Sequence, residues 1–255
     1  MTKPFINDEQ LRNLKQLLQS NDRTNQQLAL SLLRGFQLPP DFLDELRSRY
    51  PLVCLAYGFY LPFEGIRKIS LHIHDHNHAS TASLGNYTNP QLEILELDMK
   101  DRFCYLHEDP IPTIWHFTSL KKLMIKGNWS VHRLSSSIGQ LHQLESLDVI
   151  DFGCNMHTMP EEICHLTRLK HLSFQDCRLE QLPEKIGRLK NLETLNLKGN
   201  WCLEWLPKHI RYLQKLKILD LRGTGIRSLS GIESVVKYLP QTEILIHPLD
   251  VPMCV

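Results

Sequence analysis

The sequence has no excess of charge of either sign. Its 255 residues include 29 Lys and Arg against 28 Asp and Glu, which gives a formal net charge of +1. Proteins that hold nucleic acid or anionic membranes through bulk charge need a clear basic surplus. The composition therefore favours neither nucleic acid nor a membrane surface as a partner.

Long hydrophobic runs are also missing. The segment 1–7 turns polar at once, unlike a secretory signal, and no stretch approaches the roughly 18 apolar residues that span a bilayer. The seven cysteines are odd in number and scattered, which favours reduced thiols and a cytoplasmic location.

Enzyme motifs are equally scarce. There is no Gly-rich phosphate loop, no Gly-x-Ser-x-Gly turn and no Cys-x-x-Cys pair. Cys164 and His165 are adjacent, but in an outer-face segment they are expected to point in different directions. We therefore expect no catalysis and no cofactor.

One motif is present in five copies. It reads Leu-x-x-Leu-x-apolar-x-x-(Asn, Phe, Cys or Thr), and its first, fourth and sixth places point to one side of a short strand. Successive copies start 23 to 25 residues apart, at Leu120, Leu144, Leu169, Leu192 and Leu216. Two less regular copies begin at Ile66 and Leu92, and their extra length, in 76–89 and 100–113, predicts loops on one side.

The ninth place of the motif is suited to hydrogen bonding. At Asn128 and Asn200 a buried amide can bond the backbones of neighbouring turns and offset the cost of burying them. Cys177 and Thr224 are small substitutes, whereas Phe152 departs from the pattern.

A second half-repeat precedes each strand. Its clearest copy is Leu182-Pro183-x-x-Ile186-x-x-Leu189, and related copies begin at Leu134, Met159 and Leu206. Apolar residues three apart, with Pro in front, predict a short helix or 3₁₀ turn.

The motif and its period resemble those of leucine-rich-repeat proteins. The resemblance implies an α/β leucine-rich-repeat solenoid, or horseshoe, with a parallel β-sheet on the concave face and short helices or 3₁₀ turns on the convex face. The Leu-Pro-x-x-Ile-x-x-Leu motif is similar to the motifs of plant Ras-group-related repeats, of plant disease-resistance receptors and of many bacterial repeats. This resemblance implies that the concave face binds another protein. A complete resistance receptor is not expected, since its nucleotide-binding module is missing, but a receptor fragment stays open.

The predicted organisation has three parts: a helical N-terminal cap over 1–50, the solenoid of about seven repeats over 51–247, and a tail over 248–255. An independent partner-binding helical module is the alternative for the first part. The strands are predicted near residues 66–72, 92–98, 120–126, 144–150, 169–175, 192–198 and 216–222, with a closing strand near 243–247.

Helix-start signals divide the first part. Asn7 with Gln10 three residues on forms a possible capping box, Thr24 and Pro40 can begin two further helices, and Gly35 can stop the second. The second helix is expected to carry three leucines on its apolar face: Leu28, Leu32 and Leu33.

Side chains at the third, fifth and seventh places of each strand are expected to face outward on the concave side. They mix both charges with isolated apolar residues, a composition that suits a protein partner; a merely solvated face is the alternative. The predicted contact residues are Ile94, Glu96, Lys122, Met124, Lys126, Asp148, Ile150, His171, Gln175, Asn196, Lys198, Asp220 and Arg222.

Tryptophans follow the ninth place in two repeats, at Trp129 and Trp201, and Trp205 is close by. Tryptophan is enriched among residues that dominate interface energetics, so these three are candidates for protein binding along the loop edge. In the alternative interpretation each ring covers and seals its neighbouring turn.

Histidines crowd between His72 and His78, at alternate positions around Asp75. Such a run could hold zinc or copper, but a strand turning into a loop would separate its members, and we expect a polar loop without metal.

The sequence thus favours a non-catalytic protein–protein interaction scaffold. Two alternatives stay open: a regulatory subunit or inhibitor that docks on a phosphatase, GTPase or toxin, and a protein with metal in the histidine loop.

Overall fold

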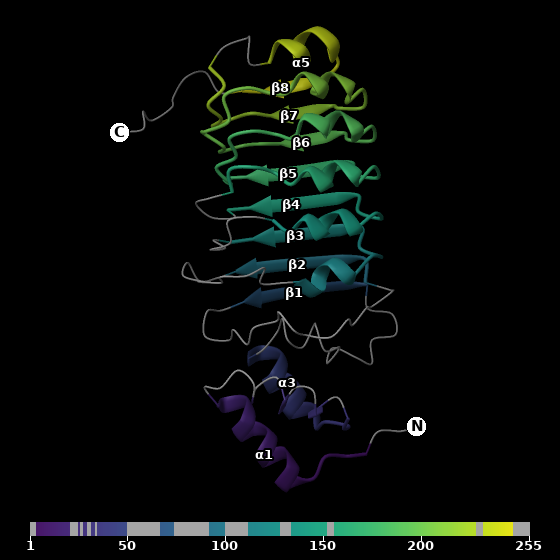
Figure 1. Cartoon of the computed structure of the whole chain (residues 1–255), viewed down its shortest axis with the longest axis vertical. Helices are drawn as coiled ribbons and strands as arrows, with labels where there is room; N and C mark the ends of the chain where they lie inside the picture. The colour runs from purple at the N-terminus through teal and green to yellow at the C-terminus, as the bar shows by residue number, and fades with distance from the viewer. Residues whose placement is uncertain are drawn as a thin grey trace, which may run out of the picture.

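The computed structural model describes residues 4–20, 25, 28–29, 32–33, 35–49, 67–73, 92–99, 112–127, 134–151, 156–227 and 232–246. Within these residues, eight strands form one parallel sheet in which each strand pairs with the next along the chain (Figure 1). The strands are β1 (Lys68–Ile73), β2 (Ile94–Met99), β3 (Lys122–Lys126), β4 (Ser146–Ile150), β5 (His171–Gln175), β6 (Thr194–Asn196), β7 (Ile218–Asp220) and β8 (Glu243–Leu245). The fold is the predicted leucine-rich-repeat solenoid.

Each of the seven repeat strands begins two residues later than predicted. The reason is that the first Leu of a repeat closes the preceding turn instead of entering the strand: the N–H of Leu144 donates to the carbonyl of Leu141, and that of Leu169 to the carbonyl of Leu166. Both leading leucines are nevertheless fully buried, so their apolar role was predicted correctly and only the strand boundary was wrong.

The fourth place of each repeat forms a continuous interior column. Leucines at this place are partners in the parallel register from β3 to β7, and all are completely buried. They are Leu123, Leu147, Leu172, Leu195 and Leu219. One turn could not bury this face alone, so the core exists only through stacking.

The convex side carries short helices, as predicted. These are the 3₁₀ helices η2 (Pro112–His116), η3 (Ser136–Gln140), η4 (Glu161–His165), η5 (Glu184–Arg188) and η6 (Lys208–Tyr212), followed by α5 (Glu233–Tyr238). Pro160, Pro183 and Pro207 stand directly before η4, η5 and η6, where their fixed φ near −60° suits a helix start.

The hydrogen-bonding role of the ninth place is confirmed at Asn200, which is fully buried. Its Oδ1 accepts from the N–H groups of Cys177 and Leu179, while its Nδ2 donates to the carbonyls of Phe174 and Leu197. One side chain therefore satisfies four backbone groups. Asn128 and Phe152 lie outside the described residues.

The N-terminal part contains α1 (Asp8–Gln19) and α3 (Pro40–Arg49), drawn at the β1 end of Figure 1. The predicted capping box of Asn7 and Gln10 is present. The two helices and the described residues between them share an apolar cluster distinct from that of the sheet: Leu14, Leu18, Ala29, Leu33, Phe42 and Leu46.

The second predicted helix is described only at residues 25, 28–29 and 32–33, all helical. Its predicted apolar face was partly wrong, since Leu28 and Leu32 are 49% and 45% exposed while Ala29 and Leu33 are buried. A cap function for this part stays a prediction.

Candidate protein interface on the concave sheet

The strand pleat sorts the outward side chains into parallel rows across the sheet, on the face opposite the 3₁₀ helices. We call this surface the concave face. A first row reads Ile94, Lys122, Ser146, His171, Thr194 and Ile218, and a middle row reads Glu96, Met124, Asp148, Ser173, Asn196 and Asp220. A third row reads Asp98, Lys126, Ile150 and Gln175. The predicted strand residues are thus brought onto one face, with Lys198 and Arg222 just beyond the ends of β6 and β7.

Apolar side chains are dispersed over this face. Met124 lies between the acidic partners Glu96 and Asp148 of its row, and Ile150 stands beside Lys126. Met124 and Ile150 are half-buried, so each keeps part of its surface available for contact. The concave face therefore presents several separate apolar side chains, each surrounded by polar ones.

The carboxylate of Asp148 is held from two sides. It accepts from His171 Nε2 at 2.9 Å on the next strand and from Ser146 Oγ at 3.1 Å on its own strand. Burial alone would raise the pKa of Asp148, but these hydrogen bonds and the nearby positive charge outweigh burial and lower it. Asp148 is therefore ionised at neutral pH and fixed in position.

The other two carboxylates of the middle row are likewise engaged. Glu96 accepts from Lys68 Nζ and Ser70 Oγ, and these hydrogen bonds lower its pKa. Burial would raise the pKa of Asp220, yet the guanidinium of Arg222, 2.5 Å away, lowers it. Asp220 is only 6% exposed, so of this pair it is Arg222 that presents the larger contact surface.

Ser146, Asp148 and His171 share the residue types of a hydrolytic triad but not its geometry. Both the hydroxyl and the imidazole bond to the same carboxylate, whereas a nucleophile must be hydrogen-bonded to its base. The cluster fixes a carboxylate and does not activate a serine.

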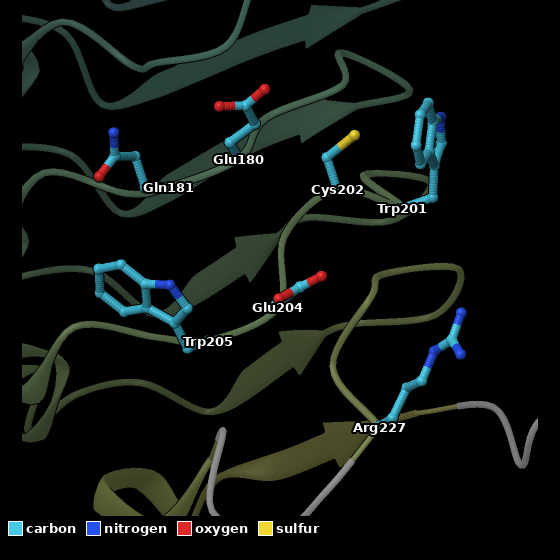
Figure 2. Close-up of a pocket in the computed structure, with 7 residues that line it drawn as sticks. All are labelled: Glu180, Gln181, Trp201, Cys202, Glu204, Trp205 and Arg227. Atoms are coloured by element: carbon cyan, nitrogen blue, oxygen red, sulfur yellow. The ribbon is translucent and has the colours of Figure 1, made fainter. Parts of the chain in front are cut away.

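At the loop edge, Trp201 and Trp205 are 44% and 45% exposed. They line an open pocket of about 610 Å³ together with Glu180, Gln181, Cys202, Glu204 and Arg227 (Figure 2). Neighbouring turns therefore leave a large part of the surface of each tryptophan uncovered. The third candidate, Trp129, lies outside the described residues.

The polar residues of this pocket were not predicted, although the repeat contained a signal. Glu180, Glu204 and Arg227 each follow a buried apolar residue at the equivalent place of three successive turns (Leu179, Leu203 and Ile226), so the turns stack them in a column. Comparison of equivalent positions outside the strands would have found them.

The histidine run falls almost entirely outside the described residues, since only the backbones of His72 and Ile73 are described. Within the described part of the chain, no three His, Cys, Asp or Glu side chains are grouped so that they could hold a metal ion. No described helix has the length and apolar character needed to span a bilayer.

Comparison with known proteins agrees with the repeat architecture. A family model described as a leucine-rich repeat region matches residues 69–200, about half of the chain. The chain belongs to the leucine-rich-repeat family.

Three individual proteins that resemble this chain share limited sequence identity with it. A uridine 5′-monophosphate transferase of Xanthomonas campestris is 32% identical over 71 residues, which are 28% of this chain and 13% of that protein. A leucine-rich-repeat protein of Leptospira interrogans is 22% identical with a TM-score of 0.48, covering 88% of this chain and 54% of that one. An internalin C2 of Listeria monocytogenes is 16% identical with a TM-score of 0.44, covering 66% of this chain and 64% of that one.

Proposed function

We propose that this chain is a non-catalytic interaction module that binds a protein partner on its concave face. The observation that carries the proposal is the setting of Met124 and Ile150: half-buried apolar side chains among charges already paired with one another. A mixture of apolar anchors and satisfied polar groups is typical of protein interfaces.

The hydrogen bonds already made by the carboxylates of the concave face lower the free-energy cost of covering them with a partner. A partner that covers Asp148 or Glu96 does not leave a bare carboxylate without hydrogen bonds, because His171 and Lys68 remain in place. The side chains also project from a regular sheet, so little backbone ordering accompanies association.

Affinity purification from the native cell, with mass spectrometry of the retained proteins, tests the proposal. The test variant combines Met124→Glu, Ile150→Glu and Lys198→Glu on the concave face. The control combines Lys185→Glu and Lys208→Glu on the convex side and lowers the net charge by the same amount.

We expect the concave variant to lose partners that both wild type and control retain. Retention of every partner by the concave variant would refute the proposal. An assay of any retained enzyme, with and without this chain, separates a passive scaffold from the regulatory alternative.

We further propose a reducing, cytoplasmic setting for this function. Cys164 and Cys177 are buried and form no disulfide, and the sulfur of Cys177 donates hydrogen bonds to the carbonyls of Val149 and Gln175. Such thiols act as small core residues.

A further inference from the structure

The tryptophan-lined pocket is separate from the concave face and is built from three successive turns. The motif Leu203-Glu204-Trp205-Leu206 repeats Leu179-Glu180-Gln181-Leu182, so Glu204 stacks on Glu180 and Trp205 on Gln181. The next turn places Arg227 at the glutamate position. Of the described residues that line the pocket, Glu180 and Glu204 are acidic and Arg227 is basic (Figure 2).

The two glutamates differ in what they bond. Glu180 is 2.6 Å from His157 Nδ1, one turn earlier in the same column. Glu204 is exposed and has no hydrogen-bond or ion-pair partner within the described part of the chain. Glu204 is therefore the carboxylate available to a ligand.

The two rings differ in the same way. The guanidinium of Arg178 lies over the Trp201 ring, 5.8 Å from its centroid, so this ring already carries a cation. Trp205 has no ring contact of this kind with any described residue, although it is 45% exposed and adjacent to Glu204 in the chain. The Arg178–Trp201 pair shows the contact that an incoming cation could repeat on Trp205.

We propose that this pocket binds an extended peptide segment of a protein partner through an arginine side chain. The guanidinium stacks on Trp205 and pairs with the carboxylate of Glu204, which combines a cation–π contact with a charge-assisted hydrogen bond. Arginine suits the pocket better than lysine because a planar guanidinium can stack on an aromatic ring with its face and donate to a carboxylate from its edge.

The other properties of the pocket are compatible with the backbone of the bound peptide. The side-chain amide of Gln181 can donate to and accept from peptide backbone groups, and a volume of about 610 Å³ accommodates a side chain with its flanking backbone. Arg227 excludes a second cation on its side of the pocket. An uncharged or acidic segment would leave Glu204 without a counter-charge.

The test begins with a phage-displayed library of random peptides panned against the full-length chain. Enriched peptides are then synthesised, and their affinities are measured by titration calorimetry beside versions with the arginine replaced by lysine or glutamate. We expect enriched peptides to contain arginine, with lysine binding more weakly and glutamate abolishing binding.

Substitutions in the pocket should change the affinity for an arginine peptide in opposite directions. Glu204→Gln and Trp205→Ala should each weaken binding of an arginine peptide about tenfold, a typical loss for one such contact. Arg227→Gln should strengthen it because a like charge is removed, while the convex control Glu161→Gln should change nothing.

Binding should also persist in the concave variant, which makes this test independent of the concave proposal. Enrichment of peptides without basic residues, or weaker binding on Arg227→Gln together with unchanged binding on Glu204→Gln, would overturn the assignment.

Discussion

The side-chain amide of Asn200 donates to the backbone carbonyl of Phe174, 2.6 Å away in the preceding turn of the solenoid. Together with its three other hydrogen bonds, this contact satisfies four backbone N–H and C=O groups at a bend of the chain. Water does not reach these groups, since Asn200 is fully buried. The stack is therefore joined by polar bonds as well as by leucine packing.

Asn200→Ala should consequently destabilise the protein. Buried N–H and C=O groups lose their partners, at about 1–3 kcal/mol for an unsatisfied group, so we expect a loss of about 3 kcal/mol in the free energy of unfolding. The control is Asn191→Ala, where the amide lies at the surface, donates to the carbonyl of Thr167 and accepts from Lys215 Nζ; it should cost less than about 1 kcal/mol because water can replace both partners. Urea unfolding measures both, and equal costs would contradict the assigned role.

The Asp148–His171 pair should make stability depend on pH at the acidic end. The folded state lowers the pKa of Asp148 below its ordinary value of 3.8, so the pair stabilises above that pH and its contribution disappears as pH falls through the folded pKa. Asp148→Asn should cost about 1 kcal/mol near neutral pH and progressively less below pH 4.

Unfolding curves of wild type and Asp148→Asn between pH 3 and 7 give this difference. Asp151→Asn is the control, because Asp151 is exposed and already occupies a left-handed backbone conformation that Asn tolerates. A stability difference for Asp148→Asn that is constant over the whole range would contradict the expected titration.

Gly187→Ala should destabilise the convex side. A Cβ at Gly187 would lie 2.3 Å from the backbone carbonyl oxygen of His209, an approach that no rotamer change relieves. We expect a cost of about 1–3 kcal/mol, the usual range for overpacking.

The matched control for that substitution is Gly139→Ala, at the equivalent place two turns earlier, where the nearest atom is a Glu162 side-chain carbon at 3.0 Å. Thermal unfolding compares the two variants. A larger loss of stability in Gly139→Ala than in Gly187→Ala would contradict the close approach of neighbouring turns at Gly187.

Sequence reasoning predicted the stacked core well, because one pattern recurs and each copy confirms the others. The column from Leu123 to Leu219 and the proline-led 3₁₀ helices follow directly from spacing. It failed where the local signal was ambiguous: the leading Leu of each repeat suits a turn as well as a strand, and Ala29 did not stand out as a core residue beside Leu28.

The candidate surfaces were predictable only in part. Alternation along a strand placed Met124 and Ile150 on the concave face, but it could not show that Arg222 covers Asp220, because side-chain pairing depends on rotamers and neighbouring turns. The pocket around Trp205 was missed for a related reason: its charges come from three turns and are far apart in sequence.

Cys164 should be unreactive in the native protein. Burial first, and then the nearby charge of Glu161, raises the pKa of its thiol to about 11, so about one part in a thousand is thiolate at pH 8. Iodoacetamide labelling followed by peptide mass spectrometry should find Cys164 unmodified until denaturant is added, and rapid native labelling would contradict the burial.

The most direct measurement of the central claim is the affinity of a recovered partner for single concave variants, determined by titration calorimetry. Met124→Glu and Ile150→Glu should each weaken binding at least tenfold, since each places a charge in a desolvated contact, while convex Lys185→Glu should leave the affinity unchanged. Unchanged affinity in both concave variants, with loss in Lys185→Glu, would contradict binding on the concave face.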